Sequence, residues 1–217
     1  MSKQTDLVEI AQDGIVVPDA SVSEARLQVS NAPVNGYALT AQSGNTGGLT
    51  WAEMAAGGTT LISTTTISSA VATVDIALPT GYGAFELFLE GVTPSSTGVS
   101  STLSVRFSSD NGSSYYQASD SYNTNGSNAA QLPITSNNDF NNEVYIALTV
   151  QGAKNSGVRT TVFSEQLLMN TDGTFRGAAV TGGAYNGDTA ITNIRIFPNG
   201  GSLDISAGTI RLYGRAV

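Results

Sequence analysis

The chain has 217 residues with a net charge of -8, and it contains neither Cys nor His. This length allows one domain of ordinary size with an appendage, and the acidity argues against nucleic-acid binding, which needs clustered Lys and Arg to neutralise phosphates. The missing residue types exclude disulfides, Ser-His-Asp and Cys-His catalysis, and zinc sites with Cys or His ligands.

The amino end reads MSKQTDLVEI, with Asp6 and Glu9 where a secretion signal needs an apolar run. No stretch reaches the ~18 consecutive apolar residues of a membrane helix. We therefore expect a protein made in a cytoplasm, without membrane insertion. No residue pattern indicates a cofactor or a resident metal, so none is predicted.

Residues 1–57 differ in composition from the rest of the chain. Short extended pieces are expected at 7–10, 15–17 and 25–29, and 19–27 reads as one or two helical turns or as an irregular loop. None of these pieces can bury a core alone. The segment is therefore predicted to be an extended anchor that is ordered by association with a partner.

A β-hairpin is predicted inside this anchor, with strands over 37–41 and 49–51 around a Gly-rich loop. Trp51 is the only tryptophan of the chain. We expect Tyr37, Leu39, Leu49 and Trp51 to make anchoring or oligomer contacts. Packing into a core or binding of a ligand are the alternatives for Trp51, since a lone aromatic side chain is most often buried.

Residues 58–217 have the length and pattern of one β-sandwich. Turn signals such as Pro79-Thr80-Gly81 separate short apolar runs, and no run has a convincing helical period. We predict an all-β head with an antiparallel sandwich of jelly-roll or Greek-key type. The expected strands are 60–66, 72–78, 84–92, 103–108, 144–150, 160–166, 177–180, 191–197 and 208–213.

In the strand over 103–108, Leu103, Val105 and Phe107 alternate with polar residues, which predicts one buried and one solvated face. The following SSDNGS stretch has the chemistry of a turn. It also offers oxygen ligands for calcium, but the spaced acidic series of an EF-hand is missing, so a plain turn is favoured. The last two expected strands each carry one apolar row, and we expect them to be neighbours.

Three motifs carry a resemblance to known proteins. The strand and turn read R-F-S-x-D-x-G-S-x-Y, the carboxyl end reads I-x-x-I-R-I-F-P followed by G-T-I-R-L-Y-G, and the hairpin reads N-x-P-x-N-G-Y-x-L-x-A and G-G-L-x-W. The first two resemble β-sandwich domains of tailed-bacteriophage virion proteins, especially fibres and receptor-binding tips. The hairpin is similar to an element near the attachment regions of tail fibres of marine and cyanobacterial phages.

The resemblance covers about half of the chain and implies a homotrimeric virion protein exposed on the particle surface, held to other virion proteins by residues 1–57. It implies a short fibre with a receptor-binding head, or a capsid decoration or head-fibre protein with no receptor. A carbohydrate-binding module of a secreted enzyme is disfavoured by the missing secretion signal.

The segment 113–142 matches none of these motifs and is the predicted receptor site. Tyr115, Tyr116, Asp120 and Tyr122 lie there among Ser and Asn, a mixture in which rings stack on sugars and carboxylates bond hydroxyls. A host-surface glycan is the expected ligand, and a decorative loop with some buried tyrosines is the alternative. Paired carboxylates from Asp110, Asp120 and Asp139 are a possible glycosidase set, but structural roles are commoner and no enzyme activity is expected.

Overall fold

The computed structural model describes residues 29–44, 46–53, 58–99, 101–124, 126–136, 140–170, 172–200 and 202–216. The chain divides into two compact units, Met1–Ala55 and Ala56–Val217, and the expected boundary was residue 57. The extended pieces and helical turns expected before residue 29 lie outside the described residues. Each unit is described by itself.

The described part of the first unit is a two-stranded hairpin. Strands β1 (Tyr37–Ala41) and β2 (Leu49–Glu53) pair antiparallel, with Leu39 opposite Trp51, and the 3-10 turn η2 (Thr46–Gly48) precedes β2. The Tyr37 N–H donates to the Val34 carbonyl at 3.0 Å, which closes the turn before β1. The Asn31 side chain binds both the N–H and the carbonyl of Trp51, each at 2.7 Å. The hairpin expected from the sequence is confirmed.

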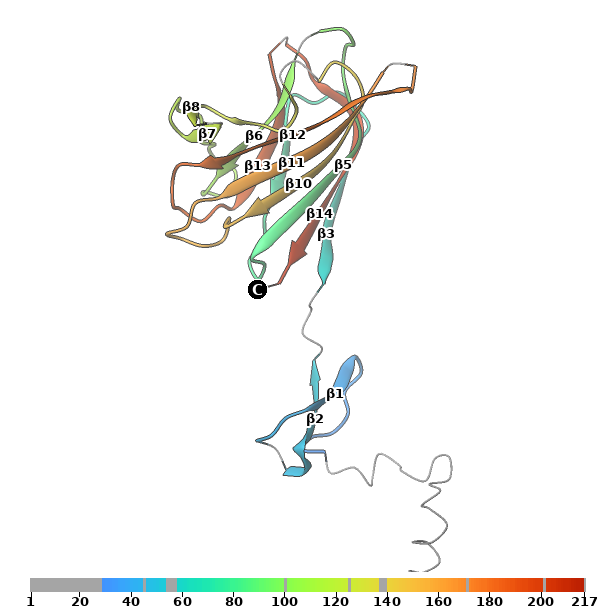
Figure 1. The fold of residues 1–217 in the computed structure, drawn as a ribbon, viewed down its shortest axis with the longest axis vertical. Coiled ribbons are helices and arrows are strands. Elements are labelled where there is room, and N and C mark those ends of the chain that lie inside the picture. Colours follow the sequence, from blue (N-terminus) through green and yellow to red (C-terminus); the bar gives the residue numbers. More distant parts are fainter. Residues whose placement is uncertain are drawn as a thin grey trace, which may run out of the picture. The chain divides into compact units, whose positions relative to one another are not determined.

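The second unit is an antiparallel β-sandwich, as the sequence predicts (Figure 1). Its larger sheet has the order β3-β14-β5-β10-β11-β12-β7-β8 and its smaller sheet the order β4-β13-β6-β9. All nine expected strands are present. The bounds in chain order are β3 (Thr59–Ile67), β4 (Val74–Ala77), β5 (Ala84–Pro94), β6 (Thr102–Ser108), β7 (Tyr122–Thr124), β8 (Ser127–Ala129), β9 (Leu132–Pro133), β10 (Val144–Gln151), β11 (Thr161–Met169), β12 (Phe175–Tyr185), β13 (Asn193–Asn199) and β14 (Ile205–Arg215).

One apolar core lies between the two sheets. Leu87 and Leu148 enter it from the larger sheet, and Val105 and Ile196 enter it from the smaller one. All four side chains are buried because alternate residues of each strand point inward. Burial of each such side chain stabilises the fold by roughly 1.5 to 3 kcal/mol.

The expectation that the last two strands are neighbours is wrong. Strand β13 pairs with β4 and β6 in the smaller sheet, whereas β14 pairs with β3 and β5 in the larger one. Ile196 and Ile210 are both buried in the core, from opposite sheets. The apolar row of a strand fixes which face is buried, but it does not determine which strand lies alongside.

The segment 113–142 contributes three short strands that the sequence pattern did not reveal. Strand β7 extends the larger sheet by pairing with β12, while β9 extends the smaller sheet by pairing with β6.

The prediction that one face of β6 is solvated is wrong in part, because Ser104 and Ser108 are buried. Two donors of the following turn, the N–H groups of Asp110 and Gly112, bind the Ser108 hydroxyl and cover it.

Candidate functional site

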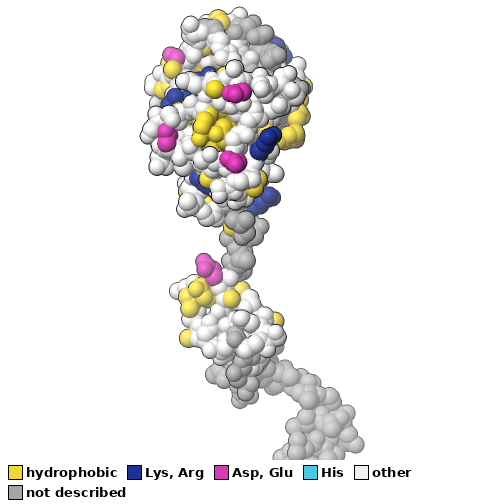
Figure 2. Space-filling view, turned by 90° about the vertical axis from the view of Figure 1, so that its left-hand side faces the viewer, with side chains coloured by type: hydrophobic (Ala, Val, Ile, Leu, Met, Phe, Trp, Pro, Cys, Tyr) yellow, Lys and Arg dark blue, Asp and Glu magenta, His cyan; other side chains and the backbone are white. Residues whose placement is uncertain are grey.

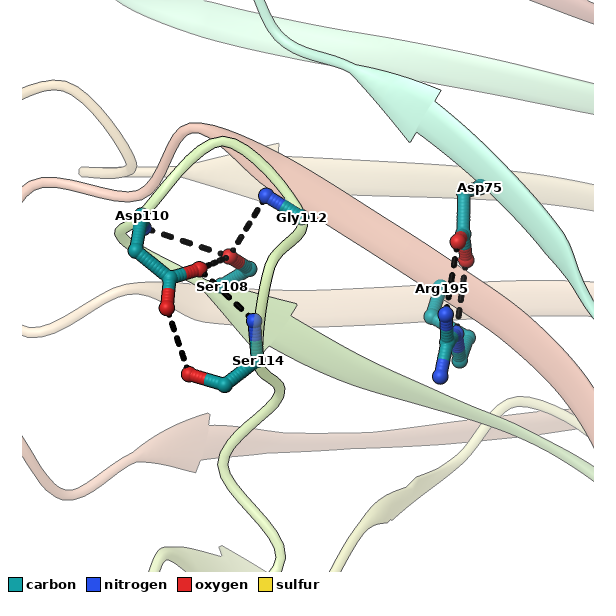
Figure 3. A network of polar contacts seen from close by, with 6 residues as sticks. All are labelled: Asp75, Ser108, Asp110, Gly112, Ser114 and Arg195. Carbon is teal, nitrogen blue, oxygen red and sulfur yellow. Dashed lines mark hydrogen bonds and ion pairs between the residues drawn. The ribbon is translucent and has the colours of Figure 1, made fainter.

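The turn after β6 is closed by the Asp110 carboxylate (Figure 3). Its oxygens accept hydrogen bonds from the Ser108 hydroxyl at 2.6 Å and from the N–H and hydroxyl of Ser114 at 2.9 and 2.5 Å. Asn111 and Gly112 have φ angles of 60° and 83°, the left-handed conformation that this sequence tolerates best. The turn is therefore built from its own side chains, as its sequence predicts.

These bonds, led by the one from Ser108, lower the pKa of Asp110 to about 2. The carboxylate thus stays charged at any ordinary pH, and its oxygens are already engaged by hydrogen-bond donors. Within the described ranges, no group of three or more acidic side chains is placed to hold a metal ion. Asp139, one of the three carboxylates considered for glycosidase chemistry, lies outside the described residues.

Tyr115 is clamped to the outer face of the smaller sheet. Arg195 on β13 makes a bidentate ion pair with Asp75 on β4, both N–O distances being 2.7 Å (Figure 3). The guanidinium carbon of Arg195 lies 3.9 Å from the centre of the Tyr115 ring. Burial, and then the nearby Asp75 carboxylate, raise the pKa of Tyr115 to about 12. One ring face is consequently occupied by a charge of the same chain.

The prediction that Tyr122 contacts a receptor is wrong. Its side chain is fully buried, and its hydroxyl accepts the Phe107 N–H at 2.8 Å and donates to the Tyr116 carbonyl at 3.0 Å. The ring lies in an aromatic cluster with Phe107 and Tyr185, at centroid distances of 6.0 and 5.8 Å. Burial also raises the pKa of Tyr122. Pairing of β7 with β12 carries this ring inward, which no local pattern signals.

Of the other two predicted receptor contacts, Tyr116 packs against the head and Asp120 lies at the surface. Tyr116 is half-buried, with its ring 4.6 Å from that of Tyr185 and its hydroxyl 2.6 Å from that of Ser109. Asp120 is exposed, and its carbonyl accepts a hydrogen bond from Asn186 at 2.6 Å. The four side chains therefore do not form one exposed surface for a glycan.

The four predicted anchoring side chains do come together. The register places Leu39 opposite Trp51, and Leu49 and Tyr37 occupy the neighbouring pairs on the same face of the hairpin. Tyr37 and Leu39 are each 37% exposed. Figure 2 shows several apolar side chains on the surface of this unit. The two-stranded sheet thus presents a largely apolar face, which also carries Glu53 opposite Tyr37.

A further surface, which the sequence reasoning missed, lies on the outer face of the larger sheet. Strands β5, β10, β11 and β12 lie side by side there (Figure 1). Directly opposite residues of neighbouring strands share a face, so two rows can be read from the register. One row is Phe88, Ala147, Glu165 and Val180, and the next is Tyr145, Leu167 and Ala178. Most of the large apolar side chains that the described head exposes belong to this face, namely Phe88, Tyr145, Phe163, Leu167, Phe175 and Val180.

This face contains a hollow of about 590 Å³, which we call the sheet hollow. The small side chains Ala147 and Ala178 leave space between larger neighbours, which explains the depression. Its volume falls within the range of ligand-binding pockets, roughly 300 to 1,000 Å³. The apolar lining is Phe88, Tyr145, Ala147, Leu167, Ala178 and Val180, together with buried residues of the same strands.

Two polar side chains around the sheet hollow already have partners. Glu90 makes an ion pair with Arg211, and the Tyr145 hydroxyl donates to Glu143 at 2.8 Å. The bond to Glu143 raises the pKa of Tyr145. A sequence signal for this surface existed, because VYIALTV carries apolar Tyr145 and Ala147 on its outer face as well, and Phe88 lies between Glu86 and Glu90 on the outer face of FELFLE. A strand with only one buried face needs no such pattern.

Among the described residues, no helix is long and apolar enough to cross a membrane. No family model and no curated protein matches the chain. The crystal structure of Caenorhabditis elegans galectin LEC-6 is similar with a TM-score of 0.31 and 11% sequence identity, over 67% of this chain and 94% of that one. A likeness of this size carries no argument about what this chain does.

Proposed function

We propose that the chain is a non-enzymatic structural protein of a tailed-phage virion, a short trimeric fibre that attaches through residues 1–57 and carries its β-sandwich head on the particle surface. The resemblance of three motifs to phage fibre domains supports this proposal. The absence of His and Cys, and the engagement of Asp110 in its own turn, support a role without catalysis.

The hairpin is the observation that carries the proposal. It exposes Tyr37 and Leu39 on the same face as Leu49 and Trp51. An isolated two-stranded sheet is at best marginally stable in water, so an apolar face on it favours a partner that covers it. Two further copies of the same hairpin are the partner that we propose, because three equivalent apolar faces turned toward one axis cover one another.

The head has two candidate roles. The glycan-binding role rests on the segment 113–142, in which Asp120 and part of Tyr115 are accessible. The alternative role, a capsid decoration or head fibre without a receptor, is favoured by the placement of Tyr116 and Tyr122, whose rings stabilise the head. Both roles leave the head at the particle surface.

Binding of the fluorescently labelled full-length chain separates the two roles. A receptor-binding fibre is expected to label host cells and to lose this label when excess unlabelled chain is added. A decoration protein is expected to label virions that lack it and to leave the host cells unlabelled. Labelling of neither would count against the proposal as a whole.

A further inference from the structure

Glu165 is the unusual residue of the sheet hollow. It lies on β11 between Ala147 and Val180, in the middle of the apolar outer face, and it is exposed. No hydrogen bond or ion pair to another described residue engages it. In contrast, Glu90 is paired with Arg211. The hollow therefore holds one carboxylate that is free to bind a ligand.

The nature of the occupant follows from what covering this carboxylate would cost. A ligand that fills the hollow displaces the water around Glu165, and a carboxylate covered without a counter-charge is strongly unfavourable. A wholly apolar occupant is therefore penalised. A second copy that packs the same face against this hollow is also disfavoured, because it would bring its own Glu165 close to this one.

The engaged polar groups argue against a sugar in this hollow. The Tyr145 hydroxyl donates its proton to Glu143, the Gln166 side chain lies on the opposite face of the sheet, and the walls are the side chains of Leu167, Val180 and Phe88. Apart from those that donate to Glu165, sugar hydroxyls placed there would lose water without gaining partners. A ligand that carries one positive charge on an otherwise apolar body fits the sheet hollow better than a sugar does.

We propose that the sheet hollow binds a segment of another protein that carries an Arg or Lys side chain between apolar residues. The cation pairs with Glu165, and the flanking side chains cover Phe88, Tyr145 and Leu167. Exposed Phe163 and Phe175 extend the apolar face beyond the hollow, which suits an extended segment more than a small molecule. This inference does not depend on the virion proposal.

Calorimetric titration of the full-length chain tests it. The probe is the capped peptide acetyl-Leu-Phe-Arg-Leu-Phe-amide, compared with the same peptide carrying neutral citrulline in place of Arg. We expect the Arg peptide to bind roughly five-fold more tightly, the upper end for an exposed ion pair. Glu165→Gln is expected to remove this difference. Asp120→Asn, which removes the same charge from another exposed position of the head, is expected to leave it intact.

Ala178→Phe is the second variant, because it fills the hollow without changing any charge. It is expected to weaken the binding of both peptides at least about ten-fold, which corresponds to the loss of one good apolar contact. Thermal unfolding shows whether each variant is folded. Equal binding of the two peptides, no effect of Glu165→Gln, or no binding at all would overturn the proposal. So would maltotriose binding that Ala178→Phe abolishes, because the hollow would then be a sugar site.

Discussion

Tyr122→Ala is expected to lower the free energy of unfolding by about 4 kcal/mol, within the range measured for removal of large buried aromatic side chains. The substitution leaves a cavity beside Phe107 and Tyr185 and deprives the Phe107 N–H of its acceptor. The pairing of β7 with β12 should weaken as well, since Tyr122 opposes Tyr185 in that ladder. Urea unfolding followed by circular dichroism measures the change.

Tyr122→Phe separates the contribution of the ring from that of the hydroxyl, because it keeps the ring and removes only the hydroxyl. We expect a loss of about 1 to 3 kcal/mol, the cost of a buried donor left without its acceptor. Asp120→Ala is the matched control from the same segment, and its change should stay within about 0.5 kcal/mol because the side chain is exposed. A Tyr122→Ala variant as stable as the parent would contradict the core role.

Leu39→Asp is expected to convert the proposed trimer into a monomer. Leu39 is opposite Trp51 on the apolar face of the hairpin, and a carboxylate there would be covered without a partner in each of three copies. Light scattering should show the mass fall from three times 22.3 kDa, about 67 kDa, to that of one chain. The melting temperature of the head should change little, because the head has its own core.

Val34→Asp is the control for this experiment. Val34 is 51% exposed and lies in the turn before β1, outside the paired strands. The same charge at this position should leave the trimer intact. A parent protein that is already monomeric at micromolar concentration, or a Leu39→Asp variant that stays trimeric, would mean that the hairpin face has another use.

The sandwich could be predicted from the sequence because each of its long strands signals itself locally. Alternation in Leu103, Val105 and Phe107 gives the buried face, and Asn and Gly mark the turns. Partner strands could not be predicted in the same way. The core accepts Ile196 and Ile210 from opposite sheets, and a row of isoleucines is equally consistent with neighbouring strands.

The candidate sites show a similar division. The hairpin face follows from a short-range register, so Leu39 and Trp51 could be brought together on sequence grounds. Tyr122 could not be placed, because its burial depends on a pairing with β12 some sixty residues away in the chain. A tyrosine in a polar segment reads as a surface residue until such long-range pairing is known.

The sheet hollow was missed for a different reason. Its residues come from strands β5, β10, β11 and β12, and each strand alone contributes only one or two apolar residues of its outer face to the hollow. The combined apolar surface becomes evident only when the register aligns Phe88, Ala147 and Val180 in one row. The role of Glu165 depends on the same alignment.

The central claim is that this chain is a virion protein, and immunogold labelling of intact purified phage particles tests it most directly. Antibodies against the head should decorate particles at fixed positions, at the tail for a fibre or over the capsid for a decoration protein. Particles that carry no label, although the chain is abundant in the lysate from which they came, would contradict the claim.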